Sequence, residues 1–369
     1  MRKKDIYFFI GTTAELIKFA PVIRELKKRR VTFKIIASAQ NSLQFNELRF
    51  FMGKQSAYYT LGVKPFKLPN FYFRFVVWMI KTVGNFLLYF GNEFKDTDKR
   101  RSFFIVHGDT ISSLIGALVA KIHGIRLVHI ESGLRSYNFL EPFPEELCRV
   151  VISRLANIHF CPNSWAVNNL KKIGGAKINT LNNTLIETLQ ATLKSTKNQI
   201  IRIIPRTKYF ILVLHRQEHI LFKKNFTKGI IKIFSEYTSS NLACVLVLHK
   251  LTKDFLRKEG LLEKIQRNKN FILVPRMPYA QFMKLTTKAE FIATDGGSNQ
   301  EEAYYMGKPC LILRDVTERI EGLGKNALLS HGKENVIRAF LKNYKKYERK
   351  PVAYIIPPSK IIVDYLVNN

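Results

Sequence analysis

The stretch Ile105-Val-His-Gly-Asp-Thr110, followed by Arg126-Leu-Val-His-Ile-Glu-Ser-Gly-Leu-Arg135, decides the fold class. Each part is a short apolar run that ends in a carboxylate: Asp109 follows residues 103–107, and Glu131 follows residues 127–130. A third carboxylate, Glu145, stands in a loop bracketed by prolines. In an open parallel sheet, strand ends of this kind line the ligand crevice. Acids gathered there suit proton transfer at carbon, because like charges and desolvation separate their pKa values.

The composition predicts two globular domains. A chain of 369 residues with 46% hydrophobic residues is long enough for two medium-sized cores. Its cysteines lie far apart and form no cluster with histidine at metal-ligand spacing, so we expect no metal and no cofactor of that kind. Reduced, buried thiols and an N-terminus without a signal-peptide apolar region favour a cytoplasmic protein. The cysteines are Cys148, Cys161, Cys244 and Cys310.

The charge is strongly basic, with 60 Lys and Arg against 28 Asp and Glu, a net charge of +32. A field of this sign attracts anions, so phosphorylated substrates and an anionic membrane face are both compatible with it. The basic residues are dispersed through ordinary amphipathic segments, and no compact nucleic-acid-binding motif is present. We therefore predict no nucleic-acid partner.

Strand, turn and helix alternate along the whole chain, which predicts an α/β protein with parallel sheets covered by helices. One series of strands runs from residue 6 to residue 161, and a second runs from residue 209 to residue 313. Between them the sequence becomes polar, basic and weakly periodic, starting at Gly174-Gly175. We therefore predict two Rossmann-like domains, 1–175 and 176–350, facing a central cleft.

Residues 71–90 form an unusually apolar and aromatic stretch. At helical spacing, Arg74, Lys81 and Asn85 share one narrow polar stripe. Two cations interrupt the stretch, which argues against a transmembrane span. It fits either a helix buried in the core or at a dimer seam, or a helix that faces an anionic membrane or a partner. The sequence alone leaves both interpretations open.

Two kinds of strand end in the second half predict an anion-binding site. Asp295-Gly-Gly-Ser298 precedes a helix, where free backbone N–H groups and the helix dipole favour a phosphate. His215 and His249 each follow a strand and each adjoin a cation, and residues 314–319 end another strand with several charges. Charged residues at successive strand ends of one sheet favour a bound anion over simple solvation.

In order and spacing, these motifs resemble the UDP-N-acetylglucosamine 2-epimerases. The resemblance runs from about residue 6 to about residue 322 and includes segments 11–18, 106–110, 129–135, 142–146, 215–218, 295–302 and 314–319. It implies a GT-B-like fold, a C-terminal segment 351–369 that returns to the first domain, and a homodimer. It also implies a UDP-sugar substrate and a reaction without nicotinamide, in which UDP leaves to give a glycal and then returns.

The resemblance also carries residue roles onto this chain. It implies acid and base candidates in the first domain, with one histidine of the second domain assisting: Asp109, Glu131, Glu145 and His215. It implies cations near the sugar and diphosphate at Lys18 and Arg149. It implies diphosphate and ribose contacts from His249, Gly297, Ser298, Glu302 and Arg319.

The sequence departs from the family pattern at four places. Thr13 stands where the family motif Gly-Thr-Arg-Pro-Glu has its arginine. Residues 295–298 read Asp-Gly-Gly-Ser instead of Asp-Ser-Gly-Gly, which moves the hydroxyl but keeps the backbone donors. Gln40-Asn-Ser42 replaces the Gln-His-Arg segment linked to activation by a second UDP-sugar, and residues 351–358 lack the family's Asn-Pro-Tyr-Gly-Asp-Gly.

The leading hypothesis is a non-hydrolysing cytoplasmic 2-epimerase that makes UDP-N-acetylmannosamine, or a close analogue, for surface polysaccharide. A close alternative is a hydrolysing 2-epimerase that releases N-acetylmannosamine and UDP. The basic charge, the apolar stretch 71–90 and the lost arginine also fit a membrane-associated GT-B glycosyltransferase at the inner membrane face. A non-enzymatic alternative is a nucleotide-sugar binder within a biosynthetic complex.

Overall fold

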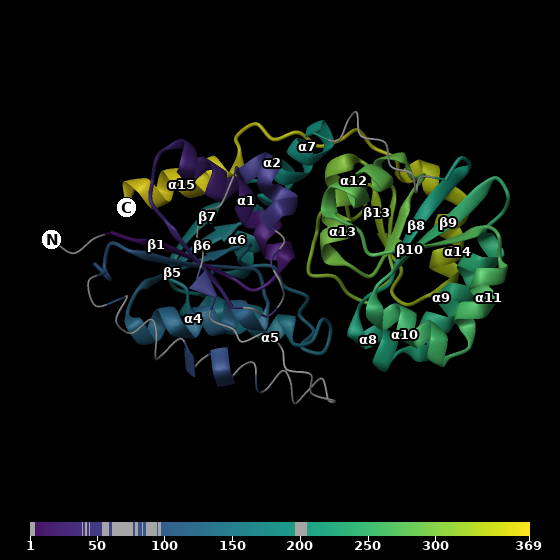
Figure 1. The fold of residues 1–369 in the computed structure, drawn as a ribbon, viewed down its shortest axis with the longest axis horizontal. Helices are drawn as coiled ribbons and strands as arrows, with labels where there is room; N and C mark the ends of the chain where they lie inside the picture. The colour runs from purple at the N-terminus through teal and green to yellow at the C-terminus, as the bar shows by residue number, and fades with distance from the viewer. Residues whose placement is uncertain are drawn as a thin grey trace. The chain divides into compact units, whose positions relative to one another are not determined.

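The structure is a computed structural model, and it describes residues 4–38, 40, 43, 45–53, 59–60, 77, 80–82, 84–85, 94, 97–195 and 205–369. The chain divides into two compact units. Unit 1 comprises Met1–Thr188 and Tyr354–Asn369, and unit 2 comprises Leu189–Ala353. The colour gradient in Figure 1 follows the chain through both units. Most of the apolar stretch 71–90 lies outside the described residues, so the alternatives for it stay predictions.

Unit 1 contains a parallel sheet which, within the described residues, has seven strands in the order β3-β2-β1-β4-β5-β6-β7. The strands are β1 (Ile6–Ile10), β2 (Lys34–Ala37), β3 (Tyr59–Thr60), β4 (Phe103–His107), β5 (Arg126–Ile130), β6 (Ile158–Cys161) and β7 (Ala176–Asn179). The helices are α1 (Thr13–Lys28), α2 (Arg49–Met52), α4 (Ile111–His123), α5 (Glu145–Leu155), α6 (Ser164–Asn169) and α15 (Pro358–Asn368), with a 3-10 turn η1 (Phe45–Leu48). Helix α7 (Leu185–Ser195) begins in unit 1 and continues into unit 2.

Unit 2 contains a second parallel sheet, in the order β10-β9-β8-β11-β12-β13. The strands are β8 (Lys208–Val213), β9 (Leu242–Leu248), β10 (Phe271–Pro275), β11 (Ile292–Thr294), β12 (Cys310–Ile312) and β13 (Ala327–Leu329). The helices are α8 (Gln217–Leu221), α9 (Lys224–Tyr237), α10 (Lys250–Lys258), α11 (Leu261–Arg267), α12 (Tyr279–Lys288), α13 (Gly297–Met306) and α14 (Glu334–Asn343), followed by η2 (Tyr344–Tyr347). The prediction of two parallel, helix-covered sheets is confirmed.

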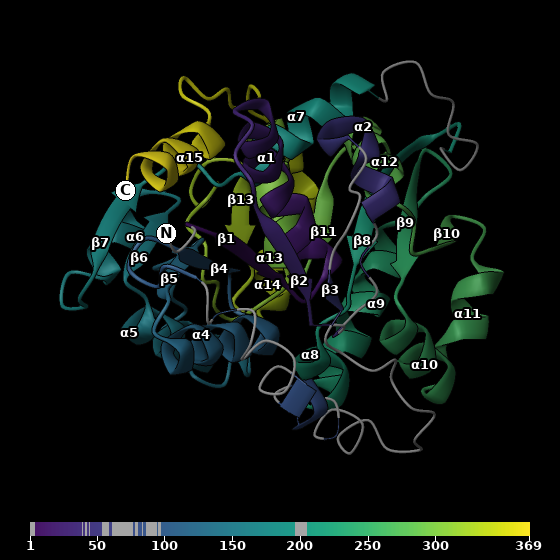
Figure 2. The same cartoon turned by 60° about the vertical axis from the view of Figure 1, so that its left-hand side comes forward.

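Both faces of each sheet are buried, as parallel sheets require. In unit 1, Tyr7 and Phe9 face α4 and α5, whereas Phe8 packs edge-on against Phe19 of α1, with ring centroids 5.1 Å apart. Figures 1 and 2 show α4 and α5 together on one face and α1 with α15 on the other. Because α1 follows β1 directly and α4 follows β4 directly, the first residues of both helices lie at the carboxyl edge of the parallel sheet.

The boundary between the units differs from the sequence-based one. Residues 176–179 form β7, which pairs in parallel with β6, and unit 1 continues to Thr188. The predicted boundary after residue 175 therefore lies too early. The physical reason is that β7 is an edge strand with partly exposed side chains, so its sequence is polar like that of a linker.

Pro21 lies in the middle of α1. Proline has no N–H to donate to the carbonyl four residues earlier, which here belongs to Ile17. The hydroxyl of Thr188 in α7 donates to that carbonyl at 2.7 Å, and the hydroxyl of Thr184 donates to the carbonyl of Lys18 at 2.6 Å. The Thr188 hydroxyl therefore replaces the backbone donor that Pro21 lacks.

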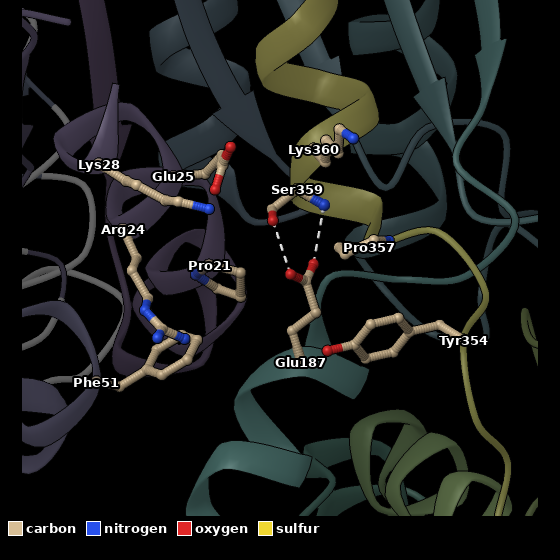
Figure 3. Close-up of a pocket in the computed structure, with 10 residues that line it drawn as sticks. All are labelled: Pro21, Arg24, Glu25, Lys28, Phe51, Glu187, Tyr354, Pro357, Ser359 and Lys360. Atoms are coloured by element: carbon tan, nitrogen blue, oxygen red, sulfur yellow. Dashed lines mark hydrogen bonds between the residues drawn. The ribbon is translucent and has the colours of Figure 1, made fainter. Parts of the chain in front are cut away.

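The C-terminal helix α15 packs against α1 in unit 1. Glu187 accepts hydrogen bonds from the backbone N and Oγ of Ser359 at 2.8 Å and 2.7 Å (Figure 3). Arg29 forms an ion pair with Asp364 at 2.6 Å. Beside these contacts lies a pocket of about 340 Å³, with the Arg24 guanidinium over the ring of Phe51. It faces the C-terminal half of α1, away from the carboxyl edge of the sheet.

Candidate functional site

Three neighbouring strands of unit 1, β1, β4 and β5, end in turns that carry polar side chains. Gly108 follows β4 with φ 66°, a conformation that glycine adopts without strain, and its N–H donates to the carbonyl of Ile130 at 3.0 Å. Glu131 follows β5 and itself has φ 65°, which is uncommon for a residue with a side chain. The β4–α4 turn and Glu131 are therefore held against each other. A strained residue at a strand end is typical of functional sites.

The Glu131 carboxylate is almost fully buried and is held by groups from three other elements. Lys18 of α1 forms an ion pair with Oε1 at 2.6 Å, and the two side chains are 7% and 4% exposed. Asn183, before α7, donates to the same oxygen at 2.5 Å. His107 lies 3.6 Å from Oε2. The structure therefore brings together the predicted pair Lys18 and Glu131 and adds an amide donor.

Arg149 of α5 contacts the second predicted acid, Asp109, through Nη2, and it contacts Glu146 through Nη1 at 2.9 Å. Glu146 also accepts from Arg135 at 2.5 Å. Burial opposes ionisation of Glu146, but the hydrogen bonds from Ser136, Arg135 and Arg149 hold its pKa below the usual value. Glu146 thus stays anionic and fixes the guanidinium of Arg149.

Glu145, the third predicted acid, is the first residue of α5 and is half-buried. Cys148, one turn later, reports on its surroundings. Burial, together with the negative charges of Asp109 and Glu145, raises the pKa of the Cys148 thiol to about 12. Asp109 and Glu145 therefore act on the same thiol, which places both carboxylates near one end of α5.

The carboxyl edge of the unit 2 sheet centres on Asp295, which follows β11 and is fully buried. Its carboxylate accepts from the backbone N of His215 at 2.9 Å and from that of Arg216 at 2.9 Å, and it lies 2.9 Å from the His215 ring nitrogen. His219 lies 3.4 Å away. Burial opposes its ionisation, but His215 and His219 hold the pKa of Asp295 well below its usual range.

The ring of His215 stacks on His249, with centroids 5.0 Å apart and planes at 26°. Burial, with the nearby charges of His215 and Arg276, lowers the pKa of His249 to about 4, so this ring is neutral at pH 7. The His215 side chain is 37% exposed, whereas the Asp295 side chain is fully buried. The arrangement presents the edge of His215 while Asp295 fixes its orientation.

The glycines at the start of α13 stand in crowded surroundings. A Cβ atom at Gly296 would lie 2.7 Å from Cε1 of His215, and one at Gly297 would lie 2.5 Å from Glu318 Oε1. No larger side chain fits at either position, and the N–H of Gly296 already donates to the Thr294 hydroxyl at 2.9 Å. The N–H groups that follow in the first turn of α13 are of the kind that bind anions at the start of a helix. Ser298, the next residue, is partly exposed.

The remaining predicted residues of unit 2 have mixed surroundings. Arg319 is 5% exposed and forms an ion pair with the buried Glu301 at 2.7 Å, and Nε of Arg319 lies 3.2 Å from a Cβ built at Gly297. Arg319 therefore lies beside the start of α13 with much of its charge balanced. Glu302 is buried and accepts from Asn299 at 3.0 Å.

Sequence reasoning missed three functional candidates: Glu15, Asn183 and Asp295 as the support of His215. Glu15 and Asp295 lie inside motifs that were recognised, and the signal was a carboxylate next to a turn. Asn183 had no signal, because its partner Glu131 is 52 residues away along the chain. Among the described residues, no group of three or more metal-ligating side chains is close enough to hold a metal ion. No helix of the described part is long and apolar enough to cross a membrane.

A family model described as UDP-N-acetylglucosamine 2-epimerase matches residues 24–355. A relative of that name from Methanocaldococcus jannaschii is 32% identical over 369 residues, covering 93% of each sequence. The crystal structure of a Neisseria meningitidis UDP-GlcNAc 2-epimerase bound to UDP-GlcNAc aligns with a TM-score of 0.82 and 30% identity, covering 100% of both chains. The Methanocaldococcus jannaschii structure with UDP-GlcNAc and UDP aligns with a TM-score of 0.81 and 27% identity, covering 99% of this chain and 100% of that one.

Proposed function

The chain belongs to the UDP-N-acetylglucosamine 2-epimerase family, and we propose that it interconverts UDP-N-acetylglucosamine and UDP-N-acetylmannosamine, or a close analogue, for surface polysaccharide synthesis. Its fold is the GT-B-like pair of Rossmann-like units of that family. The observation that carries the proposal is the set of carboxylates at the carboxyl edge of sheet 1: Asp109, Glu131 and Glu145. A protein that merely bound a UDP-sugar would not need them.

The proposed reaction removes the proton at C2 of the sugar and breaks the C1–O bond to UDP, and then restores both with the opposite configuration at C2. A carboxylate of unit 1 takes the proton from C2 of the sugar, the C1–O bond to UDP breaks, and a C1–C2 double bond forms. UDP then adds back to C1 while a proton reaches C2 on the opposite face. The acid and base come from Asp109, Glu131 and Glu145, with His215 assisting, because positioned side chains of this kind accelerate proton transfer.

The cations of unit 1 support the step in which UDP leaves. Lys18 and Arg149 each contact one of the acids, so both cations lie beside the proposed site of the reacting sugar. Electrostatic stabilisation of a departing diphosphate is a large contribution to such reactions. In unit 2, the proposed nucleotide contacts come from His249, Gly297, Ser298, Glu302 and Arg319.

The decisive experiment incubates the purified protein with UDP-N-acetylglucosamine in heavy water. Deuterium at C2, together with UDP-N-acetylmannosamine, is the expected result. No exchange from a protein that demonstrably binds UDP would sink the proposal and leave a nucleotide-sugar binder. Free N-acetylmannosamine with UDP would identify the hydrolysing reaction instead.

We also propose that the protein acts in the cytoplasm as a homodimer and associates peripherally with anionic membranes at their inner face. The net charge of +32 supports the membrane association, and the resemblance to the family supports the dimer. Flotation with vesicles of phosphatidylglycerol should recover the protein at low salt and lose it at high salt, because exposed charges are screened. Sedimentation equilibrium tests the dimer.

A further inference from the structure

Glu15 is a buried carboxylate that the proposed reaction does not use. It lies in the first turn of α1 and is 4% exposed. Its Oε2 accepts from the backbone N–H groups of Gly11 at 2.6 Å and Thr12 at 3.3 Å. The hydroxyl of Thr12 accepts in return from the N–H of Glu15 at 3.2 Å, which completes a capping box. One carboxylate oxygen of Glu15, Oε2, therefore accepts hydrogen bonds at the start of its own helix.

The other oxygen of Glu15 reaches a second turn. Oε1 accepts from the hydroxyl of Thr110 at 2.6 Å, and Thr110 is the N-cap of α4, accepting from the N–H of Ser113 at 3.0 Å. The Ser113 hydroxyl donates to the carbonyl of His107 at 2.6 Å. Asp109 stands between His107 and Thr110, so both of its flanking backbone segments are tied.

The same carboxylate also fixes the beginning of α1, the helix that carries Lys18. Residues 15 and 18 are three apart and lie on neighbouring positions of one helix face. A shift of the first turn of α1 would therefore move the ammonium group that pairs with Glu131. One buried side chain links the turns that present both predicted acid–cation pairs of unit 1.

We propose that Glu15 is a positioning residue for the C2 proton transfer, joining the β1–α1 and β4–α4 turns so that Asp109 and Lys18 keep their places. This inference rests on the proposed epimerase function. It assigns to Glu15 no contact with substrate.

The charge state of Glu15 gives the inference a distinctive signature. Burial, with a smaller contribution from the negative charge of Asp109, raises the pKa of Glu15 to about 7, although hydrogen bonds from Thr110, Gly11 and Thr12 oppose the rise. The groups that face Glu15 are those N–H and hydroxyl donors, the Ser113 hydroxyl at 3.5 Å and the carboxylate of Asp109. Only the ionised form accepts from both turns without a competing proton. The reaction rate should therefore rise as the pH passes through about 7.

The first test compares the pH profile of C2 deuterium exchange in the wild-type protein, Glu15→Gln and Glu25→Gln. Glutamine keeps the shape of Glu15 but cannot ionise, so E15Q should match the wild-type kcat near pH 6 and fall about tenfold or more below it at pH 8, with little change in KM. Glu25 lies on the same helix and pairs with Arg29 at 2.8 Å. E25Q should keep the wild-type profile.

The second test changes the partner of Glu15 and leaves the carboxylate in place. Thr110→Val removes the hydroxyl that joins the two turns and should lower kcat, whereas Thr110→Ser keeps that hydroxyl and should keep the step near pH 7. Circular dichroism and UDP titration check that each variant is folded. If the exchange rate of E15Q rises near pH 7 as it does in the wild-type protein, the positioning role is wrong although the epimerase function stands. If the wild-type protein gives no exchange, both are wrong.

Discussion

In unit 1, the carboxyl edge of the sheet carries acids whose partners are long cations, whereas in unit 2 it carries histidines and glycines around one buried acid. The Glu131 carboxylate is held by an ion pair with Lys18 and a hydrogen bond from Asn183. Asp295 provides support, since it accepts from the backbone of residues 215 and 216 and lies beside the His215 ring. A carboxylate at a strand end is thus the proposed reacting group in unit 1, whereas in unit 2 it holds the neighbouring loop and the His215 ring in place.

The difference shows that parallel-sheet topology sets where a site lies, and that the partners of each side chain set its chemistry. Parallel strands bring their carboxyl ends to one edge in both units. In unit 1, acids paired with cations at the strand ends suit proton transfer. In unit 2, a neutral His249, the start of α13 with its two glycines and a fixed His215 suit an anionic ligand.

The largest expected effect comes from Glu131→Gln, which tests the acid side of this comparison. The amide cannot accept the C2 proton, so the exchange rate should fall by about a thousandfold or more. Deuterium incorporation measures that loss, and isothermal titration measures UDP affinity, which should stay near the wild-type value because the proposed nucleotide contacts lie in unit 2. Wild-type exchange in a folded E131Q protein would remove Glu131 from the proposed mechanism.

The two buried acids should respond to pH in opposite directions. The folded-state pKa of Glu15 is raised from 4.5 to about 7, so the folded protein binds an extra proton between these values. Its contribution to the free energy of unfolding is therefore full below pH 4.5 and is lost as the pH rises through 7. The pKa of Asp295 is lowered, so its contribution is lost as the pH falls below its usual value of 3.8.

Urea unfolding of the wild-type protein and E15Q at pH 5 and pH 8 isolates the contribution of Glu15. A shift of this size corresponds to about 3 kcal/mol of stability that the wild-type protein loses between these pH values and E15Q does not. If the free energy of unfolding changes equally between pH 5 and pH 8 in the two proteins, Glu15 does not titrate in this pH range. Ionisation of Glu15 therefore lowers the free energy of unfolding while it raises the proposed reaction rate. The protein is expected to be more active but less stable at pH 8 than at pH 5.

Much of this organisation could be predicted from the sequence because it depends on local patterns. Apolar runs that end in Asp109 and Glu131 predicted β4 and β5, and Gly296-Gly297 predicted the start of α13. The edge strand β7 was not predicted, because it is short, none of its side chains is fully buried, and its apolar residues alternate with Lys177 and Asn179. Asn183 was not predicted either, since only the folded chain brings it to Glu131.

The next prediction concerns a contact of this second, non-local kind. Thr188→Val should leave the Ile17 carbonyl without its hydroxyl donor and cost about 1–3 kcal/mol of unfolding free energy. In a Pro21→Ala background the helix regains its own N–H, so the same substitution should cost less. Urea unfolding of the four proteins measures this coupling. Equal costs in both backgrounds would show that the hydroxyl does not replace the donor that Pro21 lacks.

The smallest expected effect comes from Gly296→Ala, which tests the anion side of the comparison. The added Cβ would lie 2.7 Å from Cε1 of His215 and 2.8 Å from Asn299 Oδ1, both of them side-chain atoms. Because the His215 side chain is 37% exposed, its ring can turn away, at the expense of its contact with Asp295. We expect UDP affinity to fall about tenfold, or about 1.4 kcal/mol.

Gly229→Ala in α9 is the matched control, since a Cβ there meets nothing within 4 Å. It should leave affinity unchanged and slightly stabilise the helix. An unchanged UDP affinity in G296A would mean that the His215 edge and the start of α13 do not hold the nucleotide.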